Sequence, residues 1–156
     1  MSSSPSSSLT STPKRFCFVG FARRPVQRVG PRTHNGSVSD AMVRARAQVL
    51  HDLEATRNAD ATAVSILEDA LSQRQWWLDQ WADGVDFVAG LVAQDVQDEL
   101  AETHGRWPVC PVCDEDQPLH ALYIDPDLGG PDPHWVCEES GLVVAPLGHL
   151  HAGHAH

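Results

Sequence analysis

The chain of 156 residues contains little positive charge, and none of it lies in the C-terminal third. Lysine occurs once, and residues 107–156 contain eight acidic side chains but no Lys or Arg. Affinity for nucleic acid comes chiefly from basic side chains that contact phosphate groups. Nucleic-acid binding by residues 42–156 is therefore not expected.

Long apolar runs and a disulfide framework are also missing. No stretch reaches the roughly eighteen apolar residues that a membrane-spanning helix needs, and no apolar signal-peptide core follows Met1. The four cysteines stand at uneven intervals. These features predict a protein of a reducing compartment, without a membrane anchor and located in the cytoplasm.

The positive charge is concentrated in residues 1–39, which hold six basic side chains and no acid. This segment is rich in Ser, Pro and Gly, a composition that predicts a disordered basic leader. A transit peptide or a basic arm for nucleic acid would have a similar composition. A further hypothesis is that the natural start is Met42 and that residues 1–41 are not translated. Cys17 has no partner at metal-ligand spacing.

Residues 40–105 predict a region of about three helices. The first helix begins at an Asp40 cap and ends near Thr56, and its expected apolar stripe consists of Val43, Ala47, Leu50 and Leu53. The second runs from Ala61 to about Gln75. The third has the clearest stripe, consisting of Val85, Val88, Val92, Val96 and Leu100, and Gly105 is expected to end it.

Three tryptophans, Trp76, Trp77 and Trp81, follow the second predicted helix. A ligand cage or a base-stacking platform would use such a group. Core tryptophans are far more common, because each buries a large area and satisfies a single N–H. We therefore expect these rings to fill the junction between the helices and the C-terminal lobe.

The motifs with the clearest chemistry are two pairs of metal-ligand residues, Cys110/Cys113 and His134/Cys137, with twenty residues between the pairs. A two-residue gap within each pair and a hairpin-length loop between them is the spacing of a structural zinc site. The spacing predicts one structural Zn²⁺ per chain, held by the three cysteines and a histidine. His134 is the favoured fourth ligand because it repeats the spacing of the first pair, and His120 is the alternative.

Residues 106–148 predict a zinc-ribbon-like β lobe, with strands near 119–124, from Trp135, and at 142–144. A lobe of this size has few large apolar side chains and needs a further source of stability. Structural zinc supplies an apparent binding free energy of about 10–16 kcal/mol, which becomes folding free energy. The tail 149–156 carries four histidines (His149, His151, His154 and His156) and is at most a secondary metal site. The predicted fold class is α+β.

Two kinds of catalysis are disfavoured. Cys110-Pro111-Val112-Cys113 is similar to the redox motif of thioredoxin-like proteins, but that motif opens a helix, whereas a predicted helix precedes this one. The acidic residues after Cys113 would raise the thiol pKa. A catalytic zinc keeps an open position, and four candidate ligands would close the site. No catalytic residues are assigned, and the protein is not expected to be an enzyme.

Segments of the chain resemble small uncharacterised helix-plus-zinc-ribbon proteins of high-GC, actinobacterial-type bacteria. The resemblance rests on residues 87–98, Trp107-Pro108-Val109-Cys110-Pro111-Val112-Cys113, Trp135-Val136-Cys137 and residues 144–148. It implies a helix, a knuckle (two metal ligands separated by two residues) and a closing strand over about residues 42–150. In that pattern position 113 can be His, and position 134 need not be His. It implies no established activity.

These patterns favour a zinc-stabilised interaction or adaptor protein with an unidentified protein partner. The alternatives are a nucleic-acid-associated zinc ribbon, for which only the basic leader supplies charge, and a thiol redox protein that uses Cys110 and Cys113.

Overall fold

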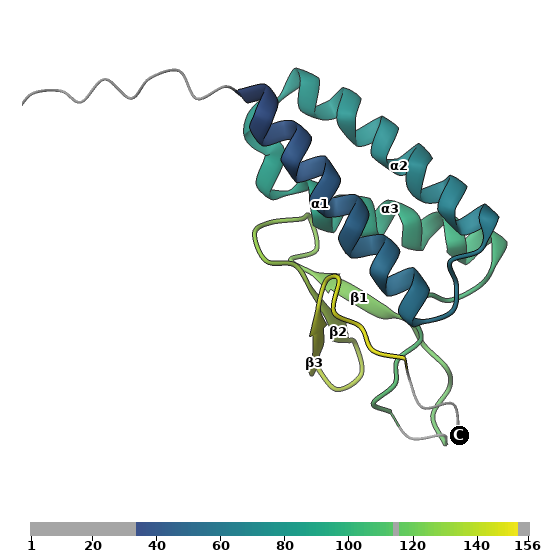
Figure 1. Cartoon of the computed structure of the whole chain (residues 1–156). Helices are drawn as coiled ribbons and strands as arrows, with labels where there is room; N and C mark the ends of the chain where they lie inside the picture. Colours follow the sequence, from purple (N-terminus) through teal and green to yellow (C-terminus); the bar gives the residue numbers. More distant parts are fainter. Residues whose placement is uncertain (1–33, 114–115, 153–156) are drawn as a thin grey trace, which may run out of the picture. The chain divides into compact units, whose positions relative to one another are not determined.

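Three helices followed by a small antiparallel sheet form the part of the chain that the structure describes, which is residues 34–113 and 116–152 of a computed structural model (Figure 1). The segment 1–33, including Cys17, and the tail residues His154 and His156 lie outside the described residues. The elements are α1 (His34–Ala55), α2 (Ala61–Gln80), the 3-10 helix η1 (Ala82–Asp86), α3 (Val88–Thr103), β1 (Leu122–Asp125), β2 (His134–Cys137) and β3 (Val143–Pro146). The strand order is β1-β2-β3. The predicted α+β class is confirmed.

The first helix differs from its prediction. It begins at His34, so Asp40 lies within the helix and does not cap it. The buried stripe consists of Ala41, Ala45, Val49 and Leu53, whereas Val43 is 66% exposed and Ala47 is exposed. Alanines occur on both the buried and the exposed face of this helix, so their burial depends on how closely the neighbouring helices pack. The predicted stripe was therefore rotated away from the true one, although Leu53 belongs to both.

The hypothesis of a start at Met42 falls on this helix. Met42 lies inside α1, and the preceding Ala41 is buried in the core. Val38 also packs against the core. A chain that began at Met42 would lack these contacts.

The second and third helices follow their patterns more closely. Asp60 caps α2 by accepting a hydrogen bond from the Ala63 N–H at 2.8 Å, and α2 continues to Gln80, beyond the predicted end. In α3 the predicted Val88, Val92 and Val96 are buried, together with Leu100. The first valine of the predicted stripe, Val85, lies before α3 in η1 and is half-buried. After α3, Gly105 takes a left-handed conformation with φ 94°, and its N–H donates to the Leu100 carbonyl at 2.9 Å. The predicted end of this helix is confirmed.

The tryptophans that fill the junction between helices and sheet are not the predicted ones. Trp107 and Trp135 are almost fully buried, and their rings meet edge to face with centroids 5.3 Å apart. Trp76 is 68% exposed and Trp81 is 44% exposed, while Trp77 is half-buried. Trp76 and Trp81, which were expected at this junction because they follow the second predicted helix, therefore lie outside the core.

A buried carboxylate connects α1 to the sheet and to the C-terminal segment. Asp52 is fully buried. Its carboxylate accepts hydrogen bonds from the Trp135 indole N–H at 2.7 Å, the Gly148 N–H at 2.7 Å and the Leu150 N–H at 2.9 Å. His51 lies 3.2 Å away on the more exposed side. Helices and strands therefore share one core, and hydrogen bonds to Asp52 also join them.

None of the helices described by the structure combines the length and the apolar character that crossing a membrane requires.

Candidate metal centre

Four ligand side chains converge at one end of the sheet. The ligand atoms of Cys110, Cys113, His120 and Cys137 all lie within 4.8 Å of one another. Cys137 is buried, and the other three are half-buried. Three soft sulfurs and one imidazole are a donor set that tetrahedral metal sites use. This group can hold a metal ion.

The distances among Cys113, His120 and Cys137 are close to the edges of a metal-centred tetrahedron. Bonds of about 2.3 Å to sulfur and about 2.0 Å to nitrogen would place two sulfurs about 3.8 Å apart, and a sulfur and a nitrogen about 3.5 Å apart. The Sγ atoms of Cys113 and Cys137 are 3.5 Å apart. Nε2 of His120 is 3.3 Å from Sγ of Cys137 and 3.6 Å from Sγ of Cys113. The three cysteines are free thiols, so no disulfide competes for them.

A short backbone ladder brings His120 to the first cysteine pair. The Cys110 N–H donates to the His120 carbonyl at 3.0 Å, and the Leu122 N–H donates to the Pro108 carbonyl at 2.8 Å. Val109 and Ala121 form an antiparallel bridge between these bonds. The chain from Cys110 to His120 therefore closes into a hairpin-like loop. Its two ends lie side by side, and this position puts the imidazole beside the thiols.

The second hairpin supplies only Cys137. This residue ends β2, and its backbone begins a tight turn in which the Gly141 N–H donates to the Cys137 carbonyl at 2.8 Å. The Leu142 carbonyl accepts from the Cys137 N–H at 2.9 Å. Gly141 has φ 69°, which a residue with a side chain rarely adopts. The turn after Cys137, rather than the strand before it, therefore forms the second side of the site.

The ring of His120 is oriented for metal coordination. Nδ1 lies 3.2 Å from the Pro118 carbonyl, which can only accept a hydrogen bond, so Nδ1 carries the proton. The lone pair of Nε2 then faces the sulfurs of Cys113 and Cys137. Metal-bound histidines usually donate their second N–H in this way, because the bond fixes the tautomer and the ring plane.

The side chains near Cys137 give the thiols different acidities. The hydroxyl and the backbone N–H of Ser140 are donors that lower the pKa of Cys137 to about 6. The Cys137 sulfur accepts a hydrogen bond from Cys113, and this contact raises the pKa of Cys113 to about 12. The same sulfur is the main cause of the raised pKa of His120. A metal that binds here must displace the protons that the thiols hold.

His134, the favoured fourth ligand in the sequence prediction, lies outside this cluster. It begins β2 and pairs with Asp125 of β1 and Pro146 of β3. Residues three apart in a strand are about 10 Å apart and point to opposite faces. His134 and Cys137 are both in β2, so they cannot approach one ion as a two-residue knuckle does. The structure instead places the alternative residue, His120, beside the thiols.

The sequence also indicated His120 as a ligand, but less strongly than His134, which repeats the two-residue spacing of the first cysteine pair. The gap from Cys113 to His120 is longer than a knuckle, so it predicts convergence only when the loop closes into a hairpin. Two features of the structure had no sequence signal. These are the Ser140 donors to Cys137 and the burial of Asp52, a residue type that is rarely buried unless it is paired.

Together, the fold and the cluster define a small α+β protein in which a Cys₃His group able to bind a metal lies at the end of a three-stranded sheet. Residues 38–147, more than half of the chain, match the family described as "Domain of unknown function (DUF8819)". The chain belongs to this family. No curated protein and no solved structure matches the chain.

Proposed function

We propose that this protein is a small interaction or adaptor protein whose β lobe is stabilised by one structural Zn²⁺. The observation that carries the proposal is the closed Cys₃His set of Cys110, Cys113, His120 and Cys137. Four protein ligands fill a tetrahedron and leave no position for water or substrate, which is the arrangement of a structural zinc site rather than a catalytic one. Three thiolates and one imidazole also favour zinc over magnesium or calcium, which prefer oxygen ligands.

The size of the lobe supports a structural role for the metal. Its strands are four residues each, and the loops around them carry exposed Leu119 and Leu128. Such short strands bury too little apolar surface to order the loops by themselves. A zinc ion that joins the 110–120 loop to the 137–142 turn would hold both in place.

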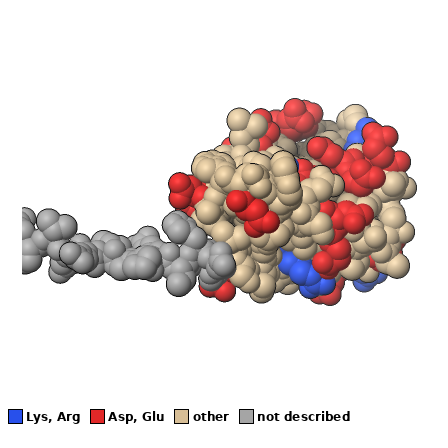
Figure 2. All heavy atoms as spheres, turned by 90° about the horizontal axis from the view of Figure 1, so that it is seen from above, with Lys and Arg blue, Asp and Glu red and all other residues tan. Residues whose placement is uncertain are grey.

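The surface supports an interaction with another protein. Several large apolar side chains are strongly exposed, namely Val43, Trp76, Leu119 and Leu128. Where such side chains form a contiguous patch they mark a protein-binding surface. Acidic side chains outnumber basic ones on the face that Figure 2 shows. A partner with basic groups fits this surface best.

The nucleic-acid alternative is less well supported. The described residues include five arginines, of which Arg46 pairs with Glu68 and Arg74 pairs with Asp95. No Lys or Arg lies within residues 107–156. An electrophoretic shift assay with residues 34–156 and single- and double-stranded oligonucleotides should show no salt-sensitive complex. A salt-sensitive shift would favour the nucleic-acid function instead.

The thiol redox alternative lacks the structural context of its motif. No helix begins at Cys110 or Cys113 within the described residues, so no helix dipole is available to activate either thiol. The contact with Cys137 raises the pKa of the Cys113 thiol to about 12, which opposes nucleophilic attack. The three free thiols are consistent with a reducing compartment, and we propose a cytoplasmic location on this ground.

A pull-down from a native lysate tests the proposed function. The bait is the full chain, in parallel with zinc and after chelation, with Cys137→Ser as the variant that removes a ligand. His134→Ala is the matched control because His134 lies outside the Cys₃His group. We expect a saturable partner with the zinc-loaded chain and with the control, and its loss after chelation and in Cys137→Ser. Equal capture in all samples, or no specific partner in any, would contradict the proposal.

A further inference from the structure

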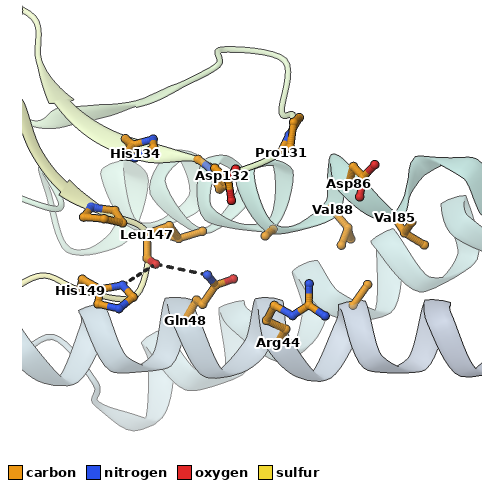
Figure 3. A pocket seen from close by; sticks show the side chains of 14 residues that line it. Arg44, Gln48, Val85, Asp86, Val88, Pro131, Asp132, His134, Leu147 and His149 are labelled. Atoms are coloured by element: carbon orange, nitrogen blue, oxygen red, sulfur yellow. Dashed lines mark hydrogen bonds between the residues drawn. The ribbon is translucent and has the colours of Figure 1, made fainter.

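A second candidate site lies on the helical side of the sheet, and it contains two histidines that the Cys₃His group leaves out. A cleft of about 520 Å³ is bounded by α1, η1, the start of α3 and the segments 131–134 and 146–149 (Figure 3). His134 and His149 both line it. The volume is in the range of small-molecule sites, roughly 300–1,000 Å³.

The polar side chains around this cleft carry both signs of charge and are not paired with each other. Arg44, Asp86, Asp132 and His134 line the cleft. None of these four side chains makes an ion pair with another residue in the described part of the chain, in contrast to Arg46 and Arg74. In Figure 3 Arg44 projects from α1 on one side of the cleft, and Asp86 and Asp132 lie on the opposite side. Separated charges of opposite sign suit a ligand that carries both.

Gln48 adds an unsatisfied acceptor to the same wall. Its Nε2 donates to the Leu147 carbonyl at 3.3 Å, whereas its buried Oε1 has no hydrogen-bond partner in the structure. Gly148 lies against this side chain, and a Cβ at that position would come within 2.8 Å of Gln48 Cγ. A buried acceptor without a donor costs free energy unless a ligand or water supplies one. An N–H group of a ligand would satisfy it once the side chain turns toward the cleft.

The opposite wall is held in a conformation that ordinary residues avoid. Asp132 has φ 54° and stands between Pro131 and Pro133. Non-glycine residues in the left-handed region cluster at binding and catalytic sites, where the surrounding structure compensates for their strain. The two prolines restrict the backbone on either side of Asp132. Asp132 lines the cleft in this backbone conformation.

From these features we propose that the cleft binds a small zwitterion with an apolar side chain, the chemistry of a free aliphatic amino acid. Arg44 would bind the carboxylate, since a guanidinium matches its geometry with paired N–H donors. Asp86, Asp132 and Oε1 of Gln48 would accept the ammonium protons. The aliphatic side chain would contact Val85 and Val88, which line the same cleft. This inference is independent of the metal centre.

The test is an NMR titration of the full, metal-loaded chain with L-leucine as the probe. N-acetyl-leucine, which lacks the ammonium group, and leucinamide, which lacks the carboxylate, are titrated in parallel. These two analogues also represent the last and first residues of a peptide. We expect saturable shifts of cleft amides with leucine, and at least about tenfold weaker binding of both analogues because each loses a set of charged hydrogen bonds.

Arg44→Gln and Arg46→Gln form the matched pair of variants, because both arginines are exposed on α1 but only Arg44 lines the cleft. Arg44→Gln should weaken leucine binding about tenfold or more, and Arg46→Gln should leave it unchanged. Native-like spectra of both variants confirm their folds. No saturable shift with leucine, equal binding of either analogue, or equal effects of the two variants would overturn the proposal.

Discussion

Asp52 joins α1 to the sheet and to the C-terminal segment through hydrogen bonds. A buried carboxylate is costly unless hydrogen bonds replace its water shell, and three N–H donors do so here. Two of the donors are backbone groups of the segment after β3, and the third is the Trp135 indole. The carboxylate therefore orders the C-terminal segment as well as the sheet.

Replacing Asp52 with Ala should destabilise the protein by at least about 3 kcal/mol, because three N–H donors, two of them in buried hydrogen bonds, lose their acceptor. Chemical denaturation gives the free energy of unfolding. Asp98→Ala, an acidic position on the exposed side of α3, is the control and should change that value by no more than about 0.5 kcal/mol. A loss below about 1 kcal/mol for Asp52→Ala would contradict the assigned role.

The capping carboxylate of Asp60 makes stability depend on pH. The Ala63 N–H, and then His104, lower the pKa of Asp60 below 3.8. A lowered folded-state pKa means that the stabilisation is present above the unfolded-state pKa and is lost as pH falls through the folded value. Asn caps a helix as well as Asp but does not titrate. The stability advantage of the wild type over Asp60→Asn should therefore shrink as pH falls below about 4. Denaturation curves at several pH values measure it, and a constant difference would argue against this contribution.

At the scale of elements, α3 was predictable because large valines recur at helical spacing and a glycine follows them. The buried stripe of α1 could not be predicted in the same way. Its inner face is made partly of Ala41 and Ala45, whose burial depends on how closely the neighbouring helices pack. The three strands were placed to within a few residues. His120 could be named only as an alternative, because its position depends on the pairing of residues 108–110 with 120–122. Such pairing between distant residues leaves little local signal.

The loop between β1 and β2 contacts the start of α3 at Gly129. This residue has φ 75°, and an added Cβ would lie 2.6 Å from the Phe87 carbonyl oxygen. Gly141, in the turn between β2 and β3, has a similar φ of 69° but open space around it.

Gly129→Ala and Gly141→Ala therefore separate backbone strain from steric conflict. Gly141→Ala should cost about 1–2 kcal/mol from the left-handed conformation alone, and Gly129→Ala should cost clearly more. Thermal unfolding compares the two variants. Equal losses would mean that the loop does not pack against α3 as the structure shows.

At the scale of the whole molecule, helices and sheet are stabilised together. Leu122, Ile124 and Trp135 of the sheet belong to the same core cluster as the buried residues of α1, α2 and α3. Gln97 of α3 also donates to the backbone of Trp107 and Leu122. Disorder in the lobe would therefore expose apolar surface on the helices.

Chelation should consequently lower the unfolding temperature of the helices, not only that of the lobe. Far-UV circular dichroism reports the helices, and Trp fluorescence reports the surroundings of the indole rings. Both signals should shift to lower temperature after chelation and return when zinc is restored. A helical transition that is unchanged by chelation would contradict the coupling through the shared core.

X-ray absorption at the zinc edge of the purified full-length protein tests the proposed metal centre most directly. It reports the number, type and distance of the ligands around the ion, and the protein's zinc content can be measured on the same sample. The proposal predicts about one zinc per chain with three sulfurs at about 2.3 Å and one nitrogen at about 2.0 Å. It also predicts the same spectrum for His134→Ala and loss of the nitrogen contribution in His120→Ala. Protein without zinc, or loss of the nitrogen ligand in His134→Ala instead, would contradict it.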